Sequence, residues 1–185
     1  MSRTRHARTP KTKRAPRTGK VAIPYKTALT LSQYLGKAIN AAAGSQLRMF
    51  VAGSLRRKKA MVGDVDLVLV DPADAAWAAL ATVRGLTLDA YGPMKASGWF
   101  KSHGKRIRVD LRRTTADSLG AALEYFTGPA GHNLGMRMKA RKAGYKLNEY
   151  GLFRLSDGAK AAGATEASIY DVLKHAWKPP EERGR

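Results

Sequence analysis

The chain has 185 residues, enough for one domain with a sizeable core, and it lacks cysteine, which excludes disulfide frameworks and cysteine-based zinc sites. It has no apolar run of about 18 residues and no apolar segment after its basic N-terminus, so we expect neither a membrane span nor a secretory signal. We therefore expect an intracellular protein. The formal net charge of +20 predicts a polyanionic partner, and nucleic acid is favoured over solubility alone.

Residues 1–20 form a basic segment that is predicted to be a disordered arm. They contain eight lysines and arginines, no acid and almost no large apolar side chain. Such a segment cannot bury enough surface to offset the entropy of ordering. We expect the arm to tether the protein to DNA, and a targeting peptide is the alternative. The rest of the chain still carries a net charge of +12.

A helix is predicted to begin at Pro24, because proline is favoured at the first helical position. Apolar residues then recur at helical spacing, and Gly44 is expected to end the helix. The elements predicted next are a strand over 49–52, a central strand over 66–70, a helix capped by Asp71-Pro72 and running to about residue 83, and strands over 86–90, 98–101 and 107–111.

The strand over 107–111 alternates between apolar and charged residues, so it has one buried face and one polar face. The pattern changes after Arg113, where we place a subdomain boundary. The elements predicted beyond it are helices over 114–126, 131–143 and 166–175 and a hairpin over 146–155 around Gly151.

A pair of carboxylates at the start of the central strand is the strongest chemical signal. Asp64 and Asp66 are two residues apart, so on a strand they point to the same face. Mg²⁺ is usually bound by one or two carboxylates and keeps its other positions for water and substrate phosphates. The pair therefore predicts a magnesium site that acts on a nucleotide.

The Gly53-Ser54 turn just before this pair is predicted to hold phosphate. Backbone amides in such a turn form an anion-binding concavity, and the guanidinium of Arg57 can grip phosphate with two parallel hydrogen bonds. We expect Gly53, Ser54 and Arg57 to bind the triphosphate of the substrate.

Asp110 is a candidate third carboxylate on the polar face of the strand over 107–111. Two-metal phosphoryl transfer needs a third oxygen ligand, and an adjacent strand can supply it. The alternative is that Asp110 only neutralises the arginines at 106, 108 and 112. The hypothesis is in-line attack by a nucleic acid 3′-hydroxyl on the α-phosphate of a nucleoside triphosphate. Asp64, Asp66 and Asp110 would hold two Mg²⁺ ions, for which Mn²⁺ can substitute.

Taken together, these residues resemble the family X DNA polymerases, the polymerase-beta-like group. Three blocks in order carry the resemblance, together with Ile169-Tyr170 and Pro179-Pro180-Glu181 near the end. The blocks are Gly53-Ser54-x-Arg56-Arg57 with Gly63-Asp64-x-Asp66; Arg108-Val109-Asp110; and Tyr125-Phe126-Thr127-Gly128 with Asn133 and Arg137, continuing into Leu147-Asn148-Glu149-Tyr150-Gly151-Leu152.

The resemblance implies an α/β (α+β) fold: a nucleotidyltransferase palm with a mixed sheet over 21–113 and a small C-terminal α+β subdomain over 114–185 that binds the nascent base pair. It also implies roles for individual residues. Tyr125, Phe126 and Gly128 would contact the incoming sugar, and Asn133 the minor-groove edge of the incoming base. Arg137 would touch the template strand, and Arg108 the catalytic carboxylates and the primer end.

Some family features are missing from this sequence. Only the basic arm precedes Ile23, so the lyase domain and helix-hairpin-helix that usually begin family members are not expected, and the chain resembles the reduced, viral-type members. Val62 replaces a frequent serine, and Ala22 a frequent arginine. Both changes would weaken triphosphate contacts, and Lys58, Lys59 or Lys101 would have to compensate.

We therefore expect a DNA-directed DNA polymerase that fills short gaps in DNA repair. Its expected partners are gapped or primed DNA and deoxynucleoside triphosphates, and it is expected to work as a monomer away from membranes. The first alternative is template-independent terminal transfer. Less favoured are a non-catalytic DNA-binding protein, and an RNA-directed enzyme such as a poly(A) or tRNA nucleotidyltransferase.

Overall fold

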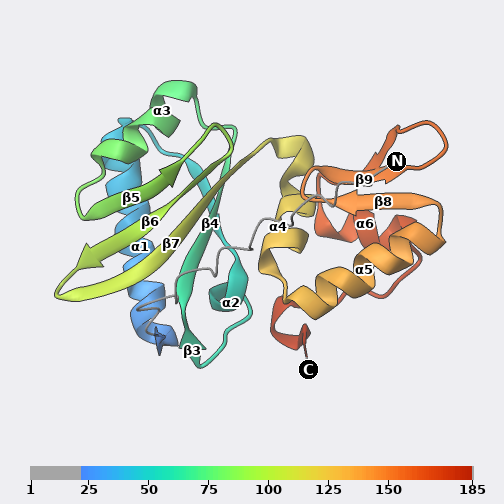
Figure 1. The fold of residues 1–185 in the computed structure, drawn as a ribbon, viewed down its shortest axis with the longest axis horizontal. Coiled ribbons are helices and arrows are strands. Elements are labelled where there is room, and N and C mark those ends of the chain that lie inside the picture. The colour runs from blue at the N-terminus through green and yellow to red at the C-terminus, as the bar shows by residue number, and fades with distance from the viewer. Residues whose placement is uncertain (1–21, 185) are drawn as a thin grey trace, which may run out of the picture.

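The computed structural model describes residues 22–184, and the predicted arm over 1–20 lies outside this range. Two parts of the molecule lie side by side (Figure 1). One part contains a five-stranded sheet with the long helix α1 against it, and the other groups three helices with a small sheet. No helix within residues 22–184 is long and apolar enough to cross a lipid bilayer.

The first part runs from β1 to β7. Its elements are β1 (Ile23–Pro24), α1 (Tyr25–Ala43), β2 (Arg48–Val51), α2 (Gly53–Arg56), β3 (Met61–Val62), β4 (Asp64–Val70), α3 (Asp74–Ala78), the 3₁₀ turn η1 (Ala79–Thr82), β5 (Leu86–Tyr91), β6 (Lys95–Ser102) and β7 (Lys105–Thr114).

The second part follows β7. Its elements are the 3₁₀ turn η2 (Ala116–Ser118), α4 (Leu119–Thr127), α5 (Ala130–Lys142), β8 (Tyr145–Asn148), β9 (Gly151–Arg154), β10 (Lys160–Ala162), α6 (Glu166–Val172) and the 3₁₀ turn η3 (Pro180–Glu182).

The five-stranded sheet has the order β2-β4-β7-β6-β5. Strands β4 and β7 are parallel, and the other neighbours are antiparallel, which confirms the predicted mixed sheet. The β4–β7 register pairs Asp64 with Arg108 and Asp66 with Asp110. Because paired residues project to the same face, this register decides which side chains meet on the sheet surface.

Helix α1 covers one face of the sheet, and its ends follow local chemistry. Leu31, Leu35 and Ile39 on α1 are buried in one core with Ile107 and Val109 of β7. Gly44 ends the helix as predicted, with a left-handed φ of 62° and an N–H bonded to the Ala41 carbonyl. Pro24 is the residue just before the helix, so it flanks the first turn instead of occupying it.

The predicted cap at Asp71-Pro72 is wrong. The helix that follows begins at Asp74, with Ala73 before it, and it continues as the 3₁₀ turn η1 instead of a full helix. Asp71 has a φ of 45°, and its carboxylate accepts a hydrogen bond from the backbone N–H of Ala116 at 2.9 Å. The side chain therefore caps the start of η2, which is distant in sequence.

The second part differs from the sequence prediction at three places. The helix expected over 114–126 starts with the turn η2, and the hairpin gains a third strand, β10, paired with β9. The last helix ends at Val172, because Lys174 adopts a left-handed φ of 48°. Residues of α4 also pack against the first part, where Ala122 and Leu123 share a small core with Ala52 and Val68.

Candidate active site

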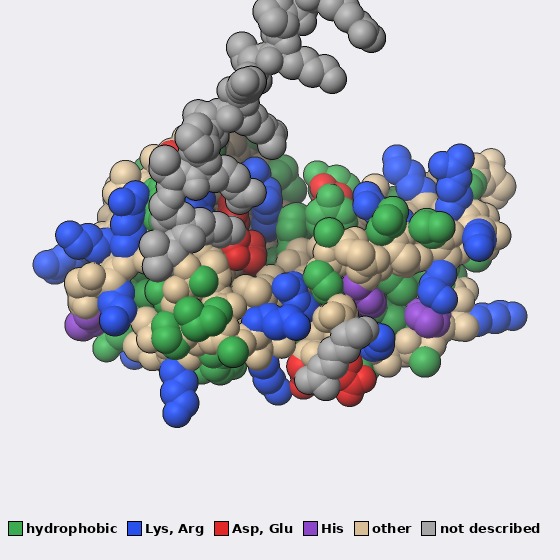
Figure 2. All heavy atoms as spheres, turned by 60° about the horizontal axis from the view of Figure 1, so that its bottom comes forward, with side chains coloured by type: hydrophobic (Ala, Val, Ile, Leu, Met, Phe, Trp, Pro, Cys, Tyr) green, Lys and Arg blue, Asp and Glu red, His purple; other side chains and the backbone are tan. Residues whose placement is uncertain are grey.

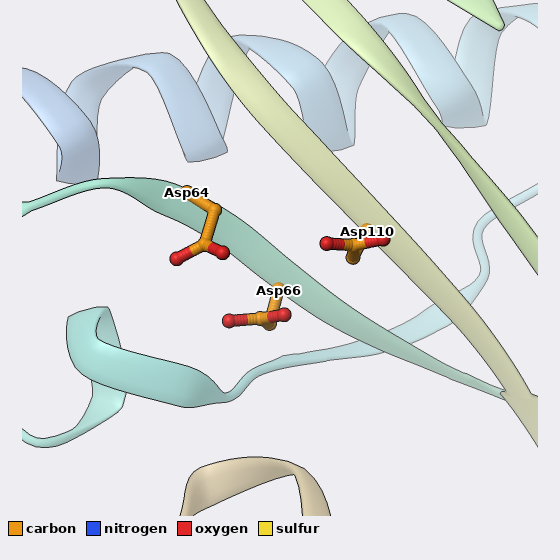
Figure 3. Close-up of side chains that lie close together, drawn as sticks. All are labelled: Asp64, Asp66 and Asp110. Atoms are coloured by element: carbon orange, nitrogen blue, oxygen red, sulfur yellow. The ribbon is translucent and has the colours of Figure 1, made fainter. Parts of the chain in front are cut away.

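Three aspartates lie together on the face of the sheet opposite α1. Asp64 and Asp66 project from β4, and Asp110 projects from β7 directly across from Asp66 (Figure 3). One carboxylate oxygen from each lies within 4.8 Å of the others, and all three residues are half-buried. The alternation of β4 and the parallel register with β7 therefore create one cluster from two distant segments.

This cluster has the donor set of a hard divalent cation. Its potential ligands are all carboxylate oxygens, which suit Mg²⁺ or Mn²⁺ and offer no soft atom for copper or thiolate chemistry. In the space-filling view, acidic side chains lie in the hollow between the two parts, with Lys and Arg side chains near them (Figure 2). Such a site fits a metal ion together with a polyanionic substrate.

The turn that carries Gly53 lies against the aspartates. The backbone at Gly53 has a φ of 57°, and a Cβ there would lie 1.8 Å from Oδ2 of Asp66. Only glycine allows both the left-handed backbone and this close approach. The predicted turn is the short helix α2, whose first residue is in contact with a candidate metal ligand.

We predict that Gly53→Ala lowers nucleotide incorporation by at least about 10²-fold, because the new methyl group must displace the Asp66 carboxylate. Steady-state primer extension measures the effect. Gly44→Ala is the matched control, since Gly44 has a φ of 62° but a Cβ there would meet no neighbouring atom within 4 Å. Equal losses in the two variants would attribute the effect to backbone strain and contradict the prediction.

Ser54 and Arg57 carry polar atoms that suit an anion. Among the described residues, Ser54 Oγ and Arg57 Nε are buried without a hydrogen-bond partner. The other end of the Arg57 guanidinium donates to the Thr127 carbonyl from the second part. Burial lowers the pKa of Arg57, while the nearby charges of Asp66 and Asp64 raise it. Orphaned donors beside a carboxylate cluster fit the phosphates of a metal-bound substrate.

Arg108 has a different partner from the one that the resemblance implies. Its guanidinium donates two hydrogen bonds to Asp89 of β5, one of them at 3.0 Å. This contact raises the pKa of Arg108 and lowers that of Asp89. Asp110 and Asp64 act on Arg108 through their charge, so the side chain lies near the cluster but is bonded to Asp89.

The residues implied in sugar and base binding come together on α4 and α5. The rings of Tyr125 and Phe126 meet edge to face, with centroids 5.1 Å apart. Asn133 Nδ2 donates to the Tyr125 carbonyl at 2.6 Å, and its Oδ1 is buried without a partner among the described residues. Tyr125, Asn133 and Arg137 border one small pocket, and Tyr125 and Arg137 also border a cavity of about 510 Å³.

Gly128 lies between these residues and the turn that carries Ser54 and Arg57. Its φ is 64°, and a Cβ there would lie 3.4 Å from Arg57 Nη1. The peptide bond from Gly128 to Pro129 is cis. The structure therefore places the α4–α5 connection directly against the turn that carries Arg57.

Sequence reasoning missed a buried charged network behind this surface. Glu166 on α6 accepts hydrogen bonds from Arg56 at 2.6 and 2.9 Å and from Arg183 at 3.0 Å. Arg183 is fully buried, and Arg56 also donates to Thr127 Oγ1 at 2.7 Å. The network joins α2, which carries Arg56, to Arg183 near the C-terminal end of the described chain.

Glu124 on α4 extends the network toward α5. It lies 3.0 Å from Arg183, 2.7 Å from Nε2 of His132 and 3.1 Å from the Tyr170 hydroxyl. Burial, followed by the charge of Glu124, raises the pKa of Tyr170. One signal was visible in the sequence: Glu124 interrupts the apolar run before Tyr125, and a buried carboxylate requires partners.

Comparisons with known proteins agree with this geometry. Residues 122–184 match the family model described as DNA polymerase beta thumb. The chain is 26% identical to Repair DNA polymerase X of African swine fever virus (isolate Tick/Malawi/Lil 20-1/1983), over 89% of this chain and 96% of the viral protein. It is 31% identical to the DNA polymerase/3′-5′ exonuclease PolX of Bacillus subtilis, over 71% of this chain and 23% of that protein.

The fold is also similar to solved structures. The crystal structure of Leishmania infantum polymerase beta in a ternary P/T complex superposes with a TM-score of 0.76 and 25% identity. The match covers 89% of this chain and 77% of that one. The ternary gap complex of the same protein gives a TM-score of 0.76 at 24% identity, over 89% of this chain and 71% of that one.

Proposed function

The chain belongs to the family X DNA polymerases, and from this premise we propose that it fills short gaps in DNA. It is a DNA polymerase with a role in repair. The observation that carries the finer proposal is the aspartate cluster in register across β4 and β7, with the turn at Gly53 packed against Asp66. The substrates would be a primer 3′-hydroxyl and a deoxynucleoside triphosphate.

Asp64, Asp66 and Asp110 are the residues that would hold the divalent metal used by this family, and we propose two Mg²⁺ ions with Mn²⁺ as a substitute. Bound divalent ions favour deprotonation of the attacking hydroxyl and neutralise charge on the phosphates. Asp110 lies at the β7 side of the cluster, which we propose as the side of the primer hydroxyl. Its carboxylate would sit nearest the proton that leaves.

The phosphates would lie over the turn at the start of α2. Gly53 allows close approach of the backbone, and Ser54 Oγ and Arg57 Nε offer hydrogen-bonding atoms that have no partner among the described residues. Positive charge there stabilises the pyrophosphate as it leaves. Release of the Arg57 contact to Thr127 would couple triphosphate binding to the position of the second part.

The nascent base pair would lie against α4 and α5. We propose that Tyr125, Phe126 and Gly128 contact the sugar and that Asn133 contacts the minor-groove edge of the incoming base, where its Nδ2 would donate to a base acceptor in place of the Tyr125 carbonyl. Arg137 borders the adjacent cavity and would contact the template strand. Arg108 would release its hydrogen bonds to Asp89 and bind the primer end instead. The proposed division of the described chain is a palm to residue 113 and a nascent-base-pair subdomain beyond it.

Primer extension across a one-nucleotide gap tests the function. Each deoxynucleotide is supplied singly with Mg²⁺, beside a bare single strand. Incorporation of mainly the complementary base supports templated gap filling. Addition of all four bases, or growth of the single strand, would replace this proposal with terminal transfer, and binding without any addition would indicate a non-catalytic protein.

We propose that the basic arm over residues 1–20 binds the phosphate backbone of DNA. Each phosphate neutralised on duplex DNA contributes about 0.9 to the slope of log affinity against log salt, so eight charges contribute at most about 7. Removing residues 1–20 should weaken gapped-DNA binding and flatten this slope. A full-length variant with glutamine at the eight basic positions is the matched control, because it removes the charge of the arm and keeps its length.

Fluorescence anisotropy at a series of salt concentrations measures both quantities. The deletion and the glutamine variant should show the same reduced slope. A slope equal to that of the full chain in either variant would contradict a role of the arm in binding DNA. We also propose that the chain works as a monomer.

A further inference from the structure

The sheet face that carries Asp110 continues away from the active site as a basic surface. On β7, Arg106 and Arg108 share the face of Asp110, because the three residues are two positions apart. The antiparallel register with β6 places Lys101 opposite Arg106, and Trp99 opposite Arg108. We call Arg106, Arg108, Trp99 and Lys101 the β6–β7 tract.

No described helix covers this tract. Helix α1 packs on the opposite face, against Ile107 and Phe100, and lies behind the strands β5–β7 in Figure 1. Helix α4 lies on the same face as the tract, but beyond the aspartates, near Val68 of β4, which pairs with Arg112. Arg106 and Lys101 are exposed, so the tract is available to a ligand.

The indole ring of Trp99 contacts the guanidinium groups of both Arg106 and Arg108. The Arg106 guanidinium lies 4.1 Å from the ring centroid, and that of Arg108 lies 5.5 Å from it. A guanidinium over an indole face is held by cation–π attraction and keeps its N–H edge for other partners. Within the described chain, Asp89 is paired with Arg108, whereas Arg106 has no ion-pair partner.

The tract has the spacing of a nucleic acid backbone that leaves the active site. Arg106 is four residues from Asp110, about 13 Å along an extended strand at about 3.3 Å per residue. Base steps of duplex DNA rise by about 3.4 Å along the helix axis, so for a duplex whose axis runs along β7 this distance corresponds to about four base steps. A strand whose 3′ end lies at Asp110 would therefore place its third to fifth phosphates near Arg106.

We propose that the β6–β7 tract binds the backbone of the primer strand three to five nucleotides behind its 3′ end, with Arg106 as the phosphate contact and Trp99 as its support. This proposal rests on the proposed function, because the direction of the strand follows from a primer hydroxyl at Asp110. The primer is favoured over the template strand because the tract shares strand β7 with Asp110, whereas the candidate template residue Arg137 lies on α5.

Uncharged methylphosphonate linkages in the primer test the contact. One such linkage replaces each of the first six phosphates from the 3′ end in turn, and the dissociation constant for gapped DNA is measured by anisotropy. The full chain should bind about tenfold more weakly when the linkage lies at the contacted phosphate. Arg106→Ala should bind normal DNA about tenfold more weakly. Its dissociation constant should not change further when the methylphosphonate lies at the contacted phosphate, whereas its response to the other linkages should match that of the full chain.

Two further variants sharpen the test. Lys37→Ala removes an exposed charge from α1 on the other side of the molecule and should keep the sensitivity of the full chain. Trp99→Leu, whose folding is checked by thermal melting, should reduce the sensitivity partly, because Arg106 keeps its charge but loses its support.

Equal sensitivity of the full chain and Arg106→Ala at all six linkages would overturn the proposal. So would a sensitivity that depends on Arg106 when the linkages are placed in the template strand. In either case, normal templated incorporation by the full chain would still support the proposed function. A full chain that neither binds gapped DNA nor extends a primer would contradict both the gap-filling function and the primer contact.

Discussion

The Asp110→Asn variant is expected to lose nucleotide incorporation by at least about 10³-fold. The substitution keeps the size of the side chain but removes the charge that completes the carboxylate cluster with Asp64 and Asp66. Stabilisation of transition-state charge by a bound metal is worth several kcal/mol, and each 1.36 kcal/mol is a factor of ten in rate. Single-turnover incorporation across a one-nucleotide gap, with Mg²⁺, measures the loss.

Binding of gapped DNA should be retained or tightened in this variant, because the change removes a negative charge from a surface that faces a polyanion. Asp171→Asn, at an exposed position of α6, is the matched control and should incorporate nucleotides like the unmodified chain. Incorporation by Asp110→Asn within tenfold of the unmodified chain would contradict the role of Asp110. It would favour the alternative that this carboxylate only neutralises neighbouring arginines.

The Glu166→Ala variant is expected to be strongly destabilised, by about 3–5 kcal/mol, because it leaves buried charges without their partner. Glu166 accepts hydrogen bonds from both Arg56 and the fully buried Arg183. In a chain of this size, about 1 kcal/mol lowers the melting temperature by about 2–4 °C, so a decrease of about 6–20 °C is expected. Urea denaturation and calorimetry measure the two quantities.

Glu182→Ala is the control for this prediction, since Glu182 is exposed in η3 and its loss should cost little. A loss of less than about 1 kcal/mol in Glu166→Ala would contradict a stabilising role of the network. The network also joins α2 to α6, so we expect the destabilised variant to bind triphosphate more weakly at temperatures where it remains folded.

The contribution of the Glu166 carboxylate to the free energy of unfolding should decrease as the pH falls. Burial by itself raises the pKa of Glu166, but the hydrogen bond and charge of Arg56, together with Arg183, outweigh it, and the pKa lies below its ordinary value. A carboxyl whose pKa is lower in the folded state stabilises the fold above its unfolded pKa and loses this contribution as the pH falls. The stability difference between the full chain and Glu166→Gln should therefore shrink in acid.

Much of the local structure could be predicted from the sequence because it depends on side chains that are close along the chain. The alternation in β7 gave its buried and polar faces, and Gly44 marked the end of α1. The spacing of Asp64 and Asp66 was enough to place both carboxylates on one face, since strand geometry has a period of two. The mixed sheet and the family were also predicted from the sequence.

Contacts between distant segments could not be predicted in the same way. The side chain of Asp71 has the chemistry of a helix cap, but it caps a turn 45 residues away. Strand β10 is three residues long and is recognised only by its pairing with β9. Neither feature leaves a periodic pattern in the sequence.

The sequence by itself determined which residues can hold metal and phosphate, because carboxylates, glycines and arginines carry that chemistry wherever they lie. Only the tertiary structure decided that Asp110 faces Asp66, through the parallel register of β4 and β7, and that Arg56 pairs with Glu166 across 110 residues. The reason is physical: alternation and capping depend on local backbone geometry, whereas register and buried ion pairs depend on how the whole chain packs.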